Sequence, residues 1–502
     1  MLLHSIGMKV PAFWKPTELN NTVVTDYPII PSLDSYQWRY VLEHDVCYEA
    51  SIFDKMVMEL VYHPERTSSV IMRTDILRDS QNDSSLCKES KDVIKSDSYQ
   101  VYRSIVRRII PRNQQLDACM EQDTILLKGS NDHKRILLYL PKLDLSLEEP
   151  YNHLPYYHPA VAGVALEYTS TKLRVAYLLN AIHQKEISTR LQRTANMLLM
   201  VLHKHCKGSV EGYEKRMLHD TVVERNNFQD TYVELKRKYS KKLIEGWVEK
   251  TDPGKHVFED LGIAAFLIEL WKQMYSSKKS FTFVDVGCGN GLLVHILLSE
   301  GYLGYGFDAR ERRSWKTYPD YVQENLSQKV LVPFFLKEIE DQPLPFIPVE
   351  SLTIHDGRFP VNSFIIGNHA DELTPYIPIL ARLNKNSSFM SIPCCVHDLT
   401  GAKISWSLPK PRDKKHGGRY AMYIEWIRQI SERFDWNIEI EPLRIPSTRN
   451  YALIGRSSKQ NASSNDTEFP TEVLKKLIDE NHGASGFLQH AMQVATSNSR
   501  SH

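Results

Sequence analysis

The sequence predicts an α/β fold, in which a doubly wound sheet follows a largely helical N-terminal region. Two observations support this prediction. From about residue 255 to residue 456, stretches with the pattern of strands alternate with stretches that have the pattern of helices, as in a sheet covered by helices on both faces. In addition, six of the 22 glycines of this 502-residue chain fall within residues 287–306, whereas average usage would spread roughly 35 along the chain. This concentration indicates special backbone geometry and a ligand close to the main chain.

The N-terminal region is assigned to residues 1–250. Residues 1–77 mix aromatic residues, prolines and apolar residues and are expected to fold, whereas the Ser- and Asp-rich residues 78–98 predict a surface loop. Residues 99–250 are expected to be mainly helical, because residues 174–208 carry apolar side chains at helical spacing and residues 232–250 are strongly charged. We therefore expect a region that is mixed at first and mainly helical afterwards.

The doubly wound sheet is assigned to residues 251–456. It opens with a helix at 256–275 that has one apolar face. The last two strands have no helix between them and predict an antiparallel hairpin at the sheet edge. Residues 457–502 are expected to be a polar linker and tail with a short helix near 471–480. The remaining expected elements are strands at 281–286 and 305–308, a strand ending at 367, strands at 387–392, 437–442 and 450–455, and helices at 291–300, 374–383 and 420–433.

Composition narrows the class of protein. The 62 Lys and Arg residues balance 61 Asp and Glu residues, which excludes a globally basic coat for nucleic acid, so any such binding must come from local patches. Seven cysteines without a C-x-x-C pair make a disulfide scaffold or a cysteine-based structural zinc site improbable and favour a reducing compartment, the cytoplasm. The longest apolar run, at 261–270, is too short to cross a bilayer, and the start of the chain does not have the pattern of a signal peptide. No membrane association is expected.

The glycine-rich window has the pattern D-x-G-x-G-x-G, which runs from Asp285 through Gly287 and Gly289 to Gly291. A turn of this kind lets a ligand approach the backbone and presents free N–H groups to it. The pattern departs from the dinucleotide fingerprint G-x-G-x-x-G, since its third glycine comes one residue early. Asp285 would also repel a pyrophosphate but suits a cationic group. Asp308, at the tip of the next strand, can accept hydrogen bonds from both hydroxyls of a ribose.

This pattern resembles motif I of the class I S-adenosylmethionine-dependent methyltransferases, whose sheet is Rossmann-like. The methyl donor fits the residues, because it carries a sulfonium and an ammonium group and no phosphate. The resemblance implies that S-adenosylmethionine is the cofactor and that Asp285, Gly287, Gly289, Gly291 and Asp308 bind it. No metal ligands are expected.

Residues 255–456 also resemble one particular family, the eukaryotic tRNA (uracil-O(2)-)-methyltransferases. The resemblance implies transfer of a methyl group to the ribose 2′-hydroxyl of the uridine at position 44 of serine tRNAs, so that tRNA is the expected partner. The N-terminal half matches only loosely and is expected to help position the tRNA. Unlike some relatives, this chain has no Cys/His zinc finger after Cys395. The stretches that carry the resemblance are residues 259–271, 285–315, 367–378, 392–398, 419–427 and 445–456.

The segment after the predicted strand that ends at Gly367 is expected at the reacting centre, because in this fold the tip of strand four faces the methyl group. Asn368, His369, Asp371 and Glu372 follow that strand. Asp371 and Glu372 are the candidate general bases or orienting groups for the substrate hydroxyl, and Asn368 is expected to orient the substrate or the methionine part of the donor.

Binding of RNA requires contacts to phosphate groups, and two basic stretches could supply them. One is residues 401–420, on an expected loop after strand five. The other is residues 310–316, where Trp315 could stack on a base. The candidate substrate-binding residues are Arg312, Arg313, Lys410, Arg412, Lys414, Lys415 and Arg419.

Three alternative functions remain open at the level of sequence. Cys394 could be the nucleophile of an RNA pyrimidine C5-methyltransferase, with its pKa lowered by His397. The chain could methylate a protein, although its basic loop is unsuited to a basic protein tail. It could also be a non-catalytic RNA-binding subunit, although an intact donor motif argues against this. The residues leave open whether a protein partner is needed.

Overall fold

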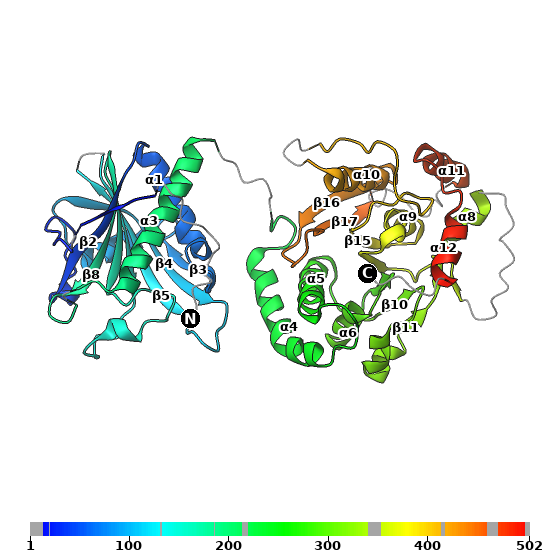
Figure 1. Ribbon diagram of the computed structural model, residues 1–502, viewed down its shortest axis with the longest axis horizontal. Helices are drawn as coiled ribbons and strands as arrows, with labels where there is room; N and C mark the ends of the chain where they lie inside the picture. Colours follow the sequence, from blue (N-terminus) through cyan, green and yellow to red (C-terminus); the bar gives the residue numbers. More distant parts are fainter. Residues whose placement is uncertain are drawn as a thin grey trace. The chain divides into compact units, whose positions relative to one another are not determined.

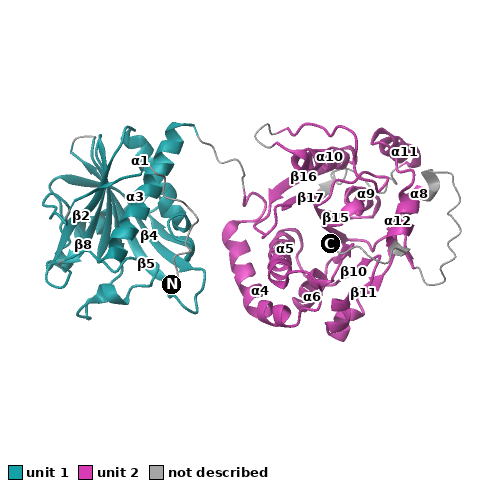
Figure 2. Cartoon of the chain, viewed as in Figure 1, with its two compact units in different colours: residues 1–214 teal, residues 215–502 magenta. Residues whose placement is uncertain are grey.

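The computed structural model describes residues 14–19, 21–130, 133–184, 186–212, 219–339, 353–412, 417–458 and 470–496. The chain divides into two compact units, Met1–Glu214 and Lys215–His502 (Figure 2). The division lies before the expected boundary at residue 250, because helix α4 (Arg225–Glu245) packs along α5 (Pro253–Met274) and thus belongs to the second unit. Within the described ranges, none of the helices combines the length and the apolarity that a membrane crossing requires.

The first unit is built on an eight-stranded antiparallel sheet with the order β1-β2-β8-β7-β6-β5-β4-β3. Helices α1 (Ala50–Tyr62) and α3 (Thr189–Val210) pack against one face of this sheet (Figure 1). Its strands are β1 (Thr17–Glu18), β2 (Tyr36–Asp45), β3 (Ile71–Asp79), β4 (Tyr99–Pro111), β5 (Met120–Gly129), β6 (Arg135–Pro141), β7 (Gly163–Tyr168) and β8 (Lys172–Asn180).

The prediction of a largely helical N-terminal region is therefore wrong for most of residues 99–180, and only α3 confirms the helix expected within 174–208. The sheet has an apolar cluster on each face, so its inner strands do not show the alternation that identifies a strand exposed on one side. Strand β6 is buried along its whole length. Such a run has no period by which a strand can be distinguished from a buried helix.

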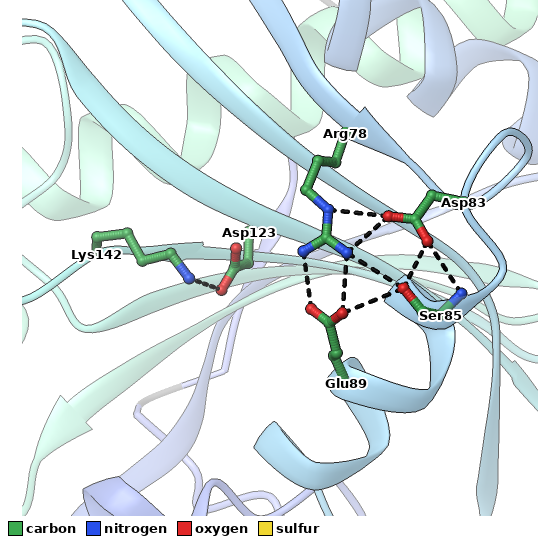
Figure 3. Close-up of polar contacts among 6 residues, drawn as sticks. All are labelled: Arg78, Asp83, Ser85, Glu89, Asp123 and Lys142. Carbon is green, nitrogen blue, oxygen red and sulfur yellow. Dashed lines mark hydrogen bonds and ion pairs between the residues drawn. The ribbon is translucent and has the colours of Figure 1, made fainter.

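Residues 78–98, expected as a loop, contain the helix α2 (Ser85–Val93). An ion-pair network joins this helix to the end of β3 (Figure 3). Arg78 Nη2 lies 2.6 Å from Asp83 Oδ2, and Arg78 Nη1 lies 2.8 Å from Glu89 Oε2. Ser85 donates to the same Asp83 carboxylate. The sequence of this segment predicts a loop because its helix buries few apolar side chains, and its polar side chains pair with one another.

The second unit contains the predicted doubly wound sheet, with the order β11-β10-β9-β14-β15-β17-β16. The strands from β11 to β15 are parallel, and β17 pairs antiparallel with both β15 and β16, which confirms the predicted edge hairpin. The strands are β9 (Thr282–Val286), β10 (Gly304–Asp308), β11 (Leu326–Gln328), β14 (Ser363–Asn368), β15 (Ser388–Ile392), β16 (Trp436–Pro442) and β17 (Tyr451–Ser458), beside a separate pair, β12 (Val330–Leu331) and β13 (Ile354–His355).

Helices cover both faces of this sheet and form two apolar clusters. The first contains α5 and α6 (Leu292–Ser299), and the second contains α9 (Tyr376–Leu383) and α10 (Arg419–Arg433). The remaining helices are the short α7 (Asp320–Gln323) and α8 (Phe334–Ile339) and the two C-terminal helices α11 (Thr471–Glu480) and α12 (Phe487–Thr496).

The C-terminal segment is more than the expected polar tail. The apolar side chains of α11 and α12, including Leu474, Ile478 and Phe487, are buried in the second cluster. The Phe487 ring lies 4.5 Å from that of Tyr376 on α9. The α/β unit thus extends to α12, beyond the expected end at residue 456. Residues 459–469, in the expected linker, lie outside the described residues.

Candidate functional site

The glycine-rich turn connects β9, an inner strand of the sheet, to α6. Gly287, Gly289 and Gly291 have φ values of 73°, 53° and 72°, the left-handed region that strains other residues. A Cβ at Gly291 would lie 2.9 Å from Leu326, whereas a Cβ at Gly289 would meet nothing within 4 Å. The turn therefore packs tightly against the protein at Gly291 and has open space beside Gly289.

Asp308 ends β10 beside this turn. Its Oδ2 accepts a hydrogen bond from the Gly289 N–H at 3.0 Å, and its Oδ1 accepts one from the Arg310 N–H at 3.0 Å. These two bonds hold the carboxylate in one orientation. Each carboxylate oxygen can accept a second hydrogen bond, so the group can still bind a pair of hydroxyls.

Asp285 is almost completely buried, with 1% of its surface exposed. Its Oδ1 has no hydrogen-bond partner among the described residues. Burial raises the pKa of Asp285 well above its usual value, and the charges of Asp260 and Asp308 raise it further. A buried carboxyl beside two other acids is costly unless a positive charge joins it.

Asp260 and Glu259 complete this acidic group, and the analysis of the sequence assigned them no role. Both lie on α5 and are buried. Burial and the charge of Glu259 raise the pKa of Asp260 to about 7. In the described part of the chain, neither Asp260 nor Asp285 has an ion-pair partner, so the site suits the sulfonium and ammonium groups of S-adenosylmethionine. The available signal was a pair of adjacent acids within the largely apolar stretch 257–271 of this helix.

The raised pKa of Asp260 predicts a pH-dependent affinity for the donor. Its pKa in the folded protein lies above the unfolded value, so its contribution to ligand-free stability is complete below the unfolded pKa and is lost as the pH rises through about 7. The ionised form attracts a cation. Affinity for S-adenosylmethionine should therefore increase about tenfold between pH 6 and pH 8. Calorimetric titration across this range measures the effect.

Asp260→Asn is the matched variant for this experiment, because asparagine keeps the shape of the side chain but does not titrate. Its affinity should change much less with pH than that of the wild type. Equal pH dependence in the two proteins would show that another group is responsible.

The carboxyl end of β14 lies next to the acidic group. Asn368 Nδ2 donates to Asp260 Oδ1 at 3.2 Å, and His369 Nε2 lies 3.1 Å from Glu259 Oε1. Asn368 Oδ1 and His369 Nδ1 have no partner among the described residues. Burial alone would raise the pKa of Glu259, but the hydrogen bond with His369 and other favourable contacts bring it below its usual value. The carboxylate is thus ionised and orients the imidazole.

Asp371 and Glu372 follow immediately. Asp371 Oδ1 accepts from Cys394 Sγ at 3.1 Å, and Glu372 Oε1 lies 3.9 Å from His490 Nε2 on α12. Asp371 has a φ of 44°, unusual for a residue other than glycine. The structure therefore brings the three residues expected to be catalytic to one strand end, while their chemical roles stay predictions.

Three side chains after β10 hold the glycine-rich turn from outside. Trp315 Nε1 donates to the Gly289 carbonyl at 2.9 Å, and Ser314 Oγ donates to the Asn290 carbonyl at 2.8 Å. Tyr318 donates to the same Asn290 carbonyl. Trp315 is buried, so it supports the turn, and the expectation that it stacks on an RNA base is wrong.

The candidate substrate-binding residues differ in their exposure and in whether they already have a partner within the protein. Lys410 and Arg313 are exposed, and Arg312 is partly buried, with an Nε that has no partner among the described residues. Arg412 pairs with Glu432 on α10 at 2.6 Å, and Arg419 donates to a carbonyl in the preceding loop. Lys414 and Lys415 lie outside the described residues. The binding of RNA by all of these candidate residues stays a prediction.

The thiolate mechanism considered for Cys394 is not supported. Burial raises the pKa of this thiol, and the adjacent Asp371 carboxylate raises it further. A nucleophilic cysteine needs the opposite shift. His397 Nδ1 contacts the Gly401 carbonyl at 2.8 Å.

Comparisons with known proteins show which family the chain is similar to. A family model described as "Predicted AdoMet-dependent methyltransferase" matches residues 222–333. A second, described as "TRM44-like, N-terminal bet v1-like domain", matches residues 16–216, the part of the chain that forms the eight-stranded sheet. The solved citrinin polyketide synthase CMeT domain is 13% identical, with a TM-score of 0.24 over 57% of this chain and 73% of that chain, which is too low to support a conclusion.

Curated relatives match along nearly the whole chain. The tRNA (uracil-O(2)-)-methyltransferase of Schizosaccharomyces pombe is 65% identical over 99% of this chain and 100% of its own length. The proteins of the same name from Neurospora crassa and Saccharomyces cerevisiae are 39% and 35% identical, over 92% and 93% of this chain and 93% and 94% of their own lengths. The chain belongs to the tRNA (uracil-O(2)-)-methyltransferase family.

Proposed function

We propose that this protein transfers the methyl group of S-adenosylmethionine to the ribose 2′-hydroxyl of a uridine in tRNA. The observation that carries the proposal is the buried acidic group around the glycine-rich turn, in a chain whose relatives bear the name of that activity. The resemblance of the sequence further implies position 44 of serine tRNAs. We also propose a cytoplasmic location, since the seven cysteines are free thiols.

The residues at the turn would hold the donor by charge and shape. Asp285 and Asp260 supply negative charge for its cationic groups, and Asp308 supplies acceptors for its ribose hydroxyls. When bound, S-adenosylmethionine supplies a methyl group already activated by a sulfonium. The protein must then align the substrate oxygen with the methyl carbon, an entropic task that contributes about 7–11 kcal/mol in favourable systems.

We assign the uptake of the hydroxyl proton to His369. Its Nε2 lies 3.1 Å from Glu259, which leaves Nδ1 as the ring nitrogen without a partner among the described residues. A carboxylate that orients an imidazole is a common arrangement for a general base. Asp371 and Glu372, expected in this role from the sequence, already contact Cys394 and His490. They stay the alternative bases.

The partner in this proposal is tRNA. The exposed cations Arg313 and Lys410, together with the other predicted substrate-binding residues, would contact phosphates near the site. The first unit would help to position the tRNA.

The experiment that tests the function is nucleoside mass spectrometry. Unmodified serine tRNA is incubated with the full-length protein and isotopically labelled S-adenosylmethionine, then digested. The expected product is labelled 2′-O-methyluridine, which maps to position 44. Label on the uracil base, or no label in tRNA, would contradict the proposal.

The same assay tests the base. His369→Asn should lower the rate constant of methyl transfer by about 10²–10⁴-fold while affinity for the donor stays unchanged. Asparagine tolerates the left-handed backbone of this residue, whose φ is 52°. Asp371→Asn and Glu372→Gln are the comparison variants. If either of them loses transfer and His369→Asn retains it, the assignment to His369 fails.

A further inference from the structure

Two neighbouring strand ends bring together a carboxylate and two thiols outside the donor-binding residues. Asp371 follows β14, while Cys394 and Cys395 follow β15. Because these strands are parallel, with Asn368 opposite Ile392, the two loops leave the sheet side by side. One carboxylate oxygen and the two sulfur atoms all lie within 4.8 Å of one another. The shortest of these contacts, from Cys394 Sγ to Asp371 Oδ1, is 3.1 Å.

These three atoms are possible ligands for a metal cation. Within the described residues, Asp371 has no ion-pair partner, and its carboxylate contacts thiols in place of a cation. The loop is held by its surroundings, since Tyr420 donates to the Pro393 carbonyl at 2.9 Å. All three side chains are partly exposed, so an ion and a further small ligand can reach them.

The chemical types of the ligand atoms indicate which metal ion the cluster would bind. Thiolates favour zinc and other soft ions over magnesium and calcium, which take oxygen ligands. Zinc also accepts carboxylates, with bonds of about 2.3 Å to sulfur and about 2.0–2.2 Å to oxygen. Tetrahedral geometry then places neighbouring ligand atoms about 3.5–3.8 Å apart. The 3.1 Å contact between Cys394 Sγ and Asp371 Oδ1 would lengthen slightly, and all three atoms already lie within 4.8 Å of one another. Three protein ligands with one open position are the usual set of a zinc site that also binds water or substrate.

We propose that Asp371, Cys394 and Cys395 bind one Zn²⁺ ion whose fourth position is open. The sequence did not indicate this site, because Asp371 is distant in the chain from the two cysteines. In addition, Cys394 and Cys395 are adjacent and do not form a C-x-x-C pair. Binding of the ion does not depend on the proposed function, so the two can fail separately. The main rival is a disulfide between the adjacent cysteines, both of which are free thiols in the structure.

Metal analysis of the full-length protein tests the site. Protein purified under reducing conditions without a histidine tag should contain about one equivalent of zinc by plasma mass spectrometry. Cys395→Ser and Asp371→Asn should lower the zinc content at least tenfold after dialysis. Cys119→Ser is the matched control, because Cys119 is an exposed thiol in the first unit, and it should retain the metal.

Replacement of zinc by cobalt gives a second readout that needs no activity. Wild-type protein with Co²⁺ should show the visible bands of a tetrahedral site and a near-ultraviolet sulfur-to-cobalt band. In Cys395→Ser the sulfur band should fall to half or less, because one of two thiolates is lost. This measurement on the wild type also stands if a variant fails to fold.

Wild-type protein that contains no zinc as isolated and shows no sulfur-to-cobalt band when Co²⁺ is added would overturn the proposal. A Cys394–Cys395 disulfide in peptides from protein kept reduced would also overturn it. Titration of the same samples with S-adenosylmethionine shows separately whether the donor site is intact.

Discussion

Asp308→Ala should reduce the affinity for S-adenosylmethionine at least about 100-fold. The carboxylate is fixed by the N–H groups of Gly289 and Arg310, both at 3.0 Å, and in the proposed complex it accepts the two ribose hydroxyls of the donor. Its removal takes away two charge-assisted hydrogen bonds to the ligand, each worth about 1.5–3 kcal/mol. It also leaves the Gly289 N–H without its acceptor and so loosens the turn. Calorimetric titration measures the affinity directly.

Two variants make this result specific. Asp308→Asn keeps the size of the side chain, and it should lose most of the affinity because an amide carries no charge and offers one oxygen. Asp320→Ala removes an exposed acid at the start of α7 and should bind the donor as the wild type does. Thermal unfolding of each variant separates loss of the site from loss of the fold. Unchanged affinity in folded Asp308→Ala would refute the assigned role.

Gly304→Ala should destabilise the second unit by about 3 kcal/mol or more, the upper range for overpacking a core. Gly304 begins β10, beside the inner strand β9. A Cβ at this position would lie 2.3 Å from a ring carbon of Phe283 and 2.4 Å from the Phe283 carbonyl oxygen. Phe283 is fully buried and its carbonyl belongs to the paired strand, so neither atom can move away cheaply. Denaturant unfolding followed by tryptophan fluorescence measures the loss.

The matched control is Gly417→Ala, since a Cβ there would meet nothing within 4 Å. Its stability should remain within about 1 kcal/mol of the wild type. Comparison of the two variants therefore separates the steric clash at β10 from the general effect on stability of adding a methyl group to a glycine. If both variants unfold at the same denaturant concentration as the wild type, the close approach of β9 and β10 is not a constraint.

The two halves of the chain differ in how far their sequence predicts their structure. In the second unit, the order of strands and helices and the edge hairpin follow from patterns within short windows, since each strand is bounded by a turn or by an amphipathic helix. In the first unit, strands such as β6 are buried on both faces, and their residues alternate no more clearly than those of a buried helix. The sequence does not predict that the C-terminal helices join the core, because Phe487 packs against Tyr376, which is distant in the chain.

The sequence by itself determined the local part of the proposed donor site. Asp285 and the three glycines lie within seven residues, so their spacing alone places them on one strand and its turn, and Asp308 follows at the end of the next strand. Only the tertiary structure decided what surrounds them: the carboxyl of Asp260, the contact of Glu259 with His369, and the cluster of Asp371 with its two cysteines. The physical reason is that parallel strands bring their carboxyl ends to one edge of the sheet, while the strand register and the packing of helices on the sheet select which distant side chains meet there.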